Sequence, residues 1–148
     1  MGIGCGMMVR RVFVDSWAWI ALADDADPQH RRALEVQSRL QEAGVQLITT
    51  NVVVYEAVEN LRRRFGLPVA LSFRRHVELI STKPETLKIV YVTWHDEEEA
   101  CAIADRYGDQ DLFVVDCLSF AVMRALSWDT AFTGDWHFTL LGFQIVPN

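Results

Sequence analysis

Short apolar runs alternate along this chain with longer segments in which apolar residues recur at helical spacing. The first run, Val9 to Val14, ends at an acid, Asp15, and reads as a buried strand. Runs of the same kind predict four more strands, so the expected strands span residues 9–15, 45–49, 87–92, 130–133 and 143–146. The pattern therefore predicts a sheet of short strands.

Helical segments fill the intervals between these runs. Turn-forming residues mark their ends: Gly44 and Gly66 follow two of them, and Pro84 interrupts a third. The expected helices span residues 16–23, 28–43, 51–65, 69–80 and 93–107, and the apolar segment 112–126 is expected to be mostly a helix that begins near Asp116. A brief helical turn is expected after Gly134-Asp135. Because strands and helices alternate, we expect an α/β fold with a mainly parallel sheet.

Composition narrows the class of protein. A length of 148 residues with 51% hydrophobic residues suits one globular domain over residues 9–148, and the net charge of −6 is too modest for a disordered chain. We interpret residues 1–8 as an N-terminal extension that is disordered or precedes the true start, since Met7 and Met8 stand just before the first strand.

Cysteine usage and hydropathy bear on the cellular compartment. Three widely spaced cysteines do not make a disulfide framework and suit a reducing cytosol. No run approaches the roughly 18 apolar residues of a membrane span, so we expect a cytoplasmic protein without a membrane partner.

Four acids stand where an ionised group is locally costly. Asp15 and Asp135 each follow an apolar strand, whereas Glu56 and Asp116 interrupt the apolar faces of helices. Burying such groups costs several kcal/mol unless they are paired or bound to a metal. Because ligand sites of parallel sheets form beyond the carboxyl ends of the strands, these acids could converge on one edge.

Converging carboxylates without a basic partner favour a hard divalent cation, Mg²⁺ or Mn²⁺. Such an ion can activate water for attack on a phosphodiester. The acidic balance disfavours nucleic-acid binding by bulk charge, but a cation can bridge carboxylates to phosphate. Each acid also has a purely structural interpretation: Asp15, Asp116 and Asp135 as helix caps, and Glu56 as a partner of Arg63.

Four segments together resemble the acidic motifs of PIN-domain proteins, and more narrowly those of VapC-type toxins. They lie in the expected order over nearly the whole chain, and the third and fourth, with the closing Gly142-Phe143, are the most specific. The segments are 12–22 around Asp15, 49–56 ending at Glu56, 116–123 starting at Asp116, and 133–138 with Thr133 and Asp135.

The resemblance implies a five-stranded parallel sheet flanked by helices and an Mg²⁺- or Mn²⁺-dependent endoribonuclease. Asp15, Glu56, Asp116 and Asp135 would be its metal ligands, and Thr133 would orient water or a carboxylate. It further implies a homodimer that acts on RNA and is inhibited by a cognate antitoxin protein. The alternative is a catalytically silent module of the same fold that retains metal or antitoxin binding.

This chain departs from the family pattern at two places. Trp17 stands where the family often has serine, and Phe113 and Val115 stand where it often has serine or threonine. These changes remove no ligand, but they could dry the site or narrow the substrate range. Asp109 and Asp111 lie just upstream of Asp116. One of them could be an accessory acid, or both could belong to a solvated loop.

Basic and aromatic residues supply the remaining candidates. Arginines on two successive helices could track RNA phosphates or could simply stabilise helix ends: Arg62, Arg63, Arg64, Arg74 and Arg75. Trp17 and Trp136 flank proposed ligands and could stack an unpaired base, although tryptophan more often anchors a core. His137 is two residues from Asp135, and on a helical turn we expect it to point elsewhere.

Overall fold

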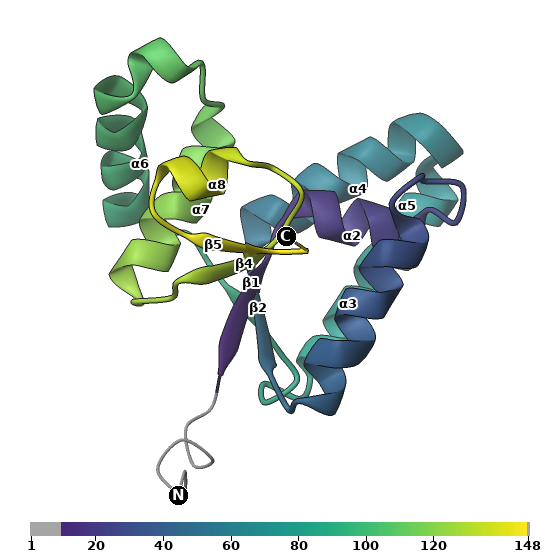
Figure 1. The fold of residues 1–148 in the computed structure, drawn as a ribbon. Coiled ribbons are helices and arrows are strands. Elements are labelled where there is room, and N and C mark those ends of the chain that lie inside the picture. The colour runs from purple at the N-terminus through teal and green to yellow at the C-terminus, as the bar shows by residue number, and fades with distance from the viewer. Residues whose placement is uncertain (1–9, 148) are drawn as a thin grey trace, which may run out of the picture.

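A five-stranded, all-parallel sheet organises the protein. The computed structural model describes residues 10–147, and the strands lie in the order β3-β2-β1-β4-β5. Their bounds are β1 Arg11–Val14, β2 Gln46–Thr50, β3 Leu87–Val90, β4 Thr130–Phe132 and β5 Gln144–Val146. The central position of β1, the first strand of the chain, places Asp15 at the middle of the carboxyl edge (Figure 1).

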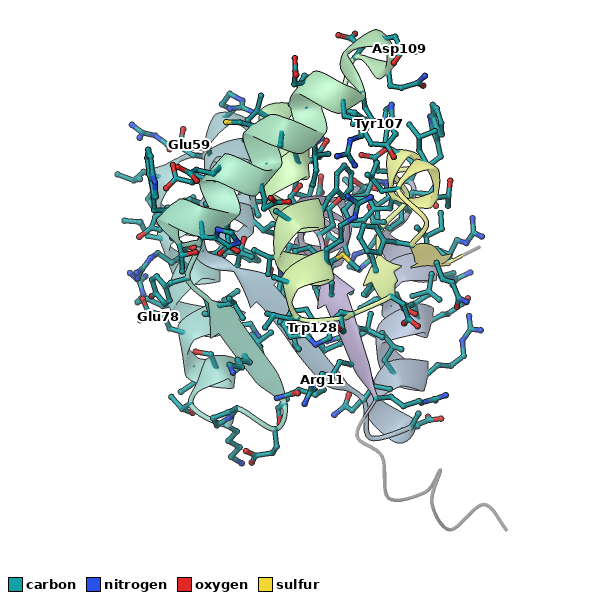
Figure 2. The ribbon with its side chains drawn as sticks, turned by 90° about the vertical axis from the view of Figure 1, so that its left-hand side faces the viewer. Arg11, Glu59, Glu78, Tyr107, Asp109 and Trp128 are labelled. Carbon is teal, nitrogen blue, oxygen red and sulfur yellow. The ribbon has the colours of Figure 1, made fainter. Side chains whose placement is uncertain are left out.

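Helices cover both faces of this sheet. In Figure 1, α6 and α7 lie on one side of the strands and α3 on the other, and Figure 2 looks at the sheet from the α6 and α7 side. The helices are α2 Ser16–Ala23, α3 His30–Glu42, α4 Asn51–Phe65, α5 Leu67–Ser81, α6 Trp94–Arg106, α7 Val114–Ala125 and α8 His137–Leu140, with a short 3₁₀ turn, η1, at Gly108–Gln110. The architecture is therefore a layered α/β fold, as the sequence predicts.

The core explains why the strands read as continuous apolar runs. Phe13, Ile48, Leu87 and Phe132, one from each of β1 to β4, are at most 1% exposed, because helices cover both faces. Burial on both faces selects β-branched and aromatic residues, which pack well on a pleated surface. The packed core thus holds the strand ends in place, and with them the residues that directly follow each strand.

Local signals in the sequence set the helix ends. The side chain of Thr50 caps α4 by accepting a hydrogen bond from the Val53 N–H at 3.1 Å. Thr93 and Asp96 form a reciprocal capping box at the start of α6. Gly66, with a φ of 91°, separates α4 from α5 in a conformation that favours glycine. The first turn of α4 is therefore fixed against β2, which holds Glu56 one turn further along.

The expected elements are all present, with shorter strands than the apolar runs suggest. The helix expected to begin near Asp116 begins at Val114, so Asp116 lies in its first turn. The predicted extension over residues 1–8 lies outside the described residues. Within residues 10–147 every helix is too short or too polar to cross a membrane.

Candidate metal centre

Asp15 is held at the point where β1 passes into α2. Its backbone N–H donates to the carbonyl oxygen of Phe132 on the neighbouring β4, and its own carbonyl oxygen accepts from Ala18 and Trp19 in the first turn of α2. The side chain is only 4% exposed. Oδ2 accepts a 2.8 Å hydrogen bond from the hydroxyl of Thr133, whereas the buried Oδ1 has no hydrogen-bond partner.

Two helices bring further carboxylates to Asp15. Glu56 projects from α4 and Asp116 from the first turn of α7, and these two helices are in contact. One carboxylate oxygen from each of Asp15, Glu56 and Asp116 lies within 4.8 Å of the others. Three residues that are 41, 60 and 101 positions apart in the chain thus form one group, which we call the acidic cluster.

Electrostatic repulsion is built into this cluster. Burial is the main cause that raises the pKa of Asp15 from 3.8 to about 7, and the charge of Asp116 adds to it. Burial also raises the pKa of Asp116 to about 7, followed by the charges of Asp135 and Glu56. No salt bridge within residues 10–147 compensates Asp15, Glu56 or Asp116.

The donor set fits a hard divalent cation. All three side chains offer carboxylate oxygens, and two buried oxygens, Oδ1 of Asp15 and Oε1 of Glu56, have no hydrogen-bond partner. Such oxygens are costly to bury and are the ligands that Mg²⁺ and Mn²⁺ prefer. The structural interpretations fare less well: the Asp15 side chain makes no cap hydrogen bond, and Glu56 forms no ion pair with Arg63 among the described residues.

Asp135 lies beside this group rather than within it. Its charge raises the pKa of Asp116, so the two carboxylates are neighbours. Its backbone N–H donates to Thr133 Oγ1 at 3.1 Å, and its Oδ1 accepts from the backbone N–H of His137 at 3.0 Å. Asp135 therefore does stabilise the start of α8 as a cap would, while its carboxylate remains close to the acidic cluster.

The expectation for His137 was wrong. Its Nδ1 lies 2.7 Å from Oδ1 of Asp135, so the ring turns back toward the acid, and it also stacks on Trp136 with centroids 4.4 Å apart. The Asp-x-His spacing is the signal in the sequence that could have indicated this contact, because an aspartate side chain in a turn often accepts a hydrogen bond from the backbone N–H two residues on, as Asp135 does from His137. A second contact that the sequence does not reveal joins Trp17 to Gly134, considered below.

The candidate RNA-contacting arginines separate into two groups. Arg64 forms a 2.8 Å ion pair with the buried Asp24, and Arg74 pairs with Glu78 and donates to the Tyr55 hydroxyl. These two have structural partners. Arg62 makes only an exposed contact of 3.8 Å with Glu59. Arg63 and Arg75 are exposed and make no ion pair within residues 10–147.

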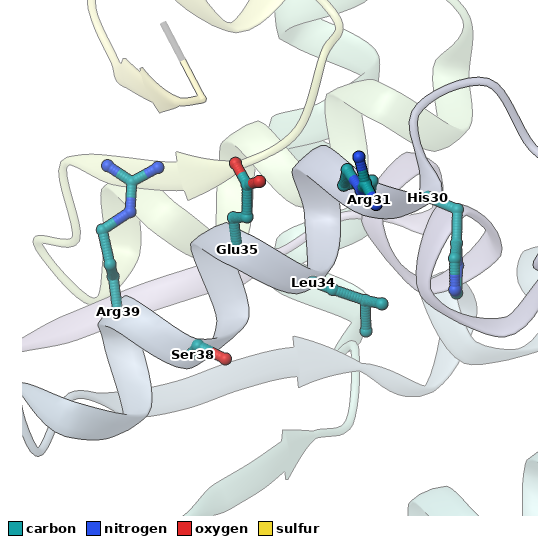
Figure 3. Close-up of a pocket in the computed structure, with 6 residues that line it drawn as sticks. All are labelled: His30, Arg31, Leu34, Glu35, Ser38 and Arg39. Atoms are coloured by element: carbon teal, nitrogen blue, oxygen red, sulfur yellow. The ribbon is translucent and has the colours of Figure 1, made fainter.

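Two other features lie apart from the acidic cluster. Asp109 and Asp111 are exposed in and after η1, and Figure 2 places Asp109 at the end of the molecule toward which the strands point. An open groove of about 800 Å³ lies on the outer face of α3, and Figure 3 shows the side chains that line it. Its lining residues come from α3 alone: His30, Arg31, Leu34, Glu35, Ser38 and Arg39. None of them belongs to the acidic cluster.

A parallel α/β sheet with three carboxylates gathered at its carboxyl edge, two of them buried and one half-buried, is consistent with a divalent-metal site. The sequence profile of the PIN domain matches residues 12–144. The chain therefore belongs to the PIN-domain family, which confirms the resemblance seen in the four acidic motifs.

Individual relatives agree with this assignment. The chain is 29% identical over 133 residues to the 23S rRNA-specific endonuclease VapC20 of Mycobacterium tuberculosis, covering 89% of this chain and 95% of the relative. The crystal structure of VapC20, described as a Sarcin-Ricin loop cleaving toxin, superposes with a TM-score of 0.74 at 28% identity over the same shares.

A more distant structure shares the fold. DNA-bound VapBC from Salmonella typhimurium matches with a TM-score of 0.62 at 10% identity, covering 93% of this chain and 97% of that one.

Proposed function

We propose that this protein is a metal-dependent endoribonuclease of the VapC type, the toxin of a toxin–antitoxin pair. The observation that carries the proposal is the acidic cluster, in which Asp15 and Asp116 are buried, Glu56 is half-buried, and none of the three has a basic partner among the described residues. The similarity to a curated RNA endonuclease over 89% of the chain supports the same reaction class.

The roles follow from the contacts of each residue. Asp15, Glu56 and Asp116 hold Mg²⁺ or Mn²⁺, and Asp135 completes the ligand set from its neighbouring position. When bound, the ion supplies activation of water and neutralises charge on the scissile phosphate. Thr133 fixes the orientation of Asp15 through the hydrogen bond to Oδ2, which leaves Oδ1 free for a ligand. Burial keeps these carboxylates away from competing water.

The substrate and partners are proposed on the same basis. VapC20 is named for cleavage of 23S rRNA, and we infer a structured RNA as the substrate of this chain, with the exposed Arg63 and Arg75 contacting its phosphates. We further infer a homodimer that is held inactive by a cognate antitoxin, acting in the reducing cytosol, where the free thiols of Cys101 and Cys117 persist.

The competing function is a silent binding module that retains the cluster without turnover. Both functions predict Mn²⁺ binding, and only the enzyme predicts RNA cleavage. Three clustered carboxylates without a basic partner, two of them buried, are costly to maintain, which favours a role that uses the ion's charge on a substrate. The two functions are therefore separated by an assay of cleavage and not by an assay of binding.

The test uses purified protein and three kinds of RNA: a 23S rRNA fragment containing the Sarcin-Ricin loop, other structured RNAs and single-stranded RNAs. Each is incubated with Mg²⁺, with Mn²⁺ or with EDTA. Asp116→Asn is the inactive variant, and Asp109→Asn, an exposed carboxylate outside the acidic cluster, is the matched control.

We expect metal-dependent cleavage that is lost with EDTA and in Asp116→Asn, and is retained in Asp109→Asn. Mn²⁺ binding without cleavage of any RNA would favour the silent module. Cleavage that persists in Asp116→Asn would contradict the metal centre proposed here.

A further inference from the structure

The indole of Trp17 lies directly against the backbone of Gly134. Trp17 is in the first turn of α2, two residues after Asp15, and Gly134 follows the neighbouring strand β4. A Cβ atom added to Gly134 would lie 2.5 Å from Cζ2 and 2.6 Å from Nε1 of Trp17. These distances are well inside van der Waals contact, so only glycine fits beneath the ring.

Backbone conformation does not explain this glycine. Among the described glycines, a positive φ occurs at Gly44, Gly66 and Gly142, and Gly134 is not one of them. Alanine could therefore adopt the backbone angles of residue 134 but not the space. The absence of a side chain at position 134 is therefore matched to the indole of Trp17.

The turn under the indole carries Asp135. The backbone N–H of Asp135 donates to Thr133 Oγ1, and its Oδ1 is held by His137. The Trp17 ring closes the remaining side of this turn at Gly134. Because α2 begins directly after Asp15, one short segment carries the Asp15 carboxylate and also contacts, through Trp17, the turn that carries Asp135.

We propose that Trp17 is a positioning residue that acts through Gly134 to set the Asp135 carboxylate against the acidic cluster. The inference rests on the proposed metal-dependent cleavage. It differs from the other use of an indole beside a nucleic-acid site, the stacking of an unpaired base. Positioning predicts coupling between Trp17, Gly134 and Asp135, and base stacking does not.

The experiment compares six proteins: the wild type, Trp17→Ala, Gly134→Ala, the Trp17→Ala/Gly134→Ala double variant, Asp135→Asn, and Asp135→Asn combined with Trp17→Ala. Each is measured for its Mn²⁺ dissociation constant by calorimetry and for kcat and KM of RNA cleavage. Trp128→Phe is the control for general loss of packing. Trp128 is buried, and it lies near Arg11, at the end of the sheet from which the strands start (Figure 2).

We expect Gly134→Ala to weaken Mn²⁺ binding and lower kcat by about 10- to 100-fold, the cost of misplacing a group by about 1 Å. Removing the indole relieves the clash, so the double variant recovers to the level of Trp17→Ala alone. In the Asp135→Asn background, Trp17→Ala causes no further loss. Trp128→Phe changes the thermal midpoint without changing the Mn²⁺ dissociation constant.

The proposal is overturned by any of three results. The first is a Gly134→Ala variant whose Mn²⁺ dissociation constant and kcat equal those of the wild type. The second is a double variant in which the losses of Trp17→Ala and Gly134→Ala multiply. The third is a Trp17→Ala variant that raises only KM, as base stacking predicts. If the wild type binds Mn²⁺ but cleaves no RNA, the proposed function fails while the six Mn²⁺ dissociation constants still decide the coupling. If the wild type binds no Mn²⁺, both proposals fail.

Discussion

The Thr133 hydroxyl donates a hydrogen bond of 2.8 Å to Oδ2 of Asp15, joining residues 118 positions apart in the chain. The same hydroxyl oxygen accepts the backbone N–H of Asp135. Thr133 is fully buried, so water cannot replace either bond. One side chain thus fixes the orientation of one carboxylate and the backbone of another, on adjacent strands of the sheet.

Thr133→Val is expected to weaken the metal centre. The hydrogen bond from Thr133 lowers the pKa of Asp15 against the effect of burial, so its loss raises that pKa further above about 7. Less of Asp15 is then ionised at neutral pH, and the rising limb of the pH–rate profile moves to higher pH. An additional shift of one unit corresponds to about 1.4 kcal/mol and about a tenfold loss of activity on that limb.

Thr133→Ser provides the matched comparison, because it restores the hydroxyl and removes only a methyl group. The measurement is the RNA cleavage rate between pH 6 and 9 for all three proteins at one fixed, subsaturating Mn²⁺ concentration, where protons and the ion compete for Asp15. A profile of Thr133→Val that coincides with that of the wild type would show that the hydrogen bond does not tune Asp15.

Stability without metal is expected to fall as the pH rises. The folded-state pKa values of Asp15 and Asp116 are about 7, above the ordinary value of 3.8. The folded protein therefore holds protons that the unfolded chain has released, and this stabilisation, complete below about pH 4, is lost as the pH rises through about 7. For either group alone the change is about 4 kcal/mol, and because the groups interact the combined change is less than the sum.

Urea unfolding in EDTA at pH 5 and at pH 8 measures this effect, with the unfolding free energy as the readout. Mn²⁺ should stabilise the protein more at pH 8 than at pH 5, because it binds the ionised carboxylates. An unfolding free energy that rises between pH 5 and pH 8 in EDTA would contradict the assignment of Asp15 and Asp116 as the dominant titrating groups.

Asp116→Asn is expected to abolish cleavage and to stabilise the metal-free fold. The charge of Asp116 raises the pKa of Asp15, and Asp116 is itself opposed by Asp135 and Glu56, so a neutral amide removes several repulsive pairs. A gain of about 1 kcal/mol corresponds to a rise of about 2–4 °C in the thermal midpoint for a chain of this size. Calorimetry in EDTA at pH 8 checks the sign, with Asp109→Asn as the control that leaves the midpoint unchanged.

The fold follows from the sequence because its signals are local. Apolar runs of the right length, glycines such as Gly66, and capping residues such as Thr50 each act within a few positions, so the elements and the parallel sheet are predictable. The position of Asp15 is also predictable, since the carboxyl ends of parallel strands share one edge, whereas Glu56 and Asp116 reach that edge through the packing of α4 and α7. The four-motif resemblance then names the family.

Contacts between side chains are less accessible from the sequence. The Trp17 and Gly134 pair depends on the spacing of two adjacent strands and on one rotamer of the indole. The return of His137 to Asp135 depends on how tightly the turn before α8 winds. The division of the arginines depends on Asp24, which becomes a partner of Arg64 only when the loop after α2 folds back on the end of α4. Such contacts form only in the folded protein.

Replacing Arg63 with glutamine is expected to affect RNA binding, whereas replacing Arg64 with glutamine is expected to affect stability. Arg63→Gln removes an exposed charge that has no ion pair within residues 10–147, so it should leave the thermal midpoint unchanged and weaken RNA binding. For single-stranded RNA the slope of log affinity against log salt should fall by about 0.7 for one lost phosphate contact.

Arg64→Gln leaves the buried Asp24 without its 2.8 Å partner and should lower the thermal midpoint. The arginine changes are made in the inactive Asp116→Asn variant, so that the RNA is not cleaved. Fluorescence anisotropy with an RNA ligand in Ca²⁺, at three salt concentrations, then gives the slope for this parent and for each arginine variant. Equal slopes for Arg63→Gln and its parent would place Arg63 outside the RNA interface.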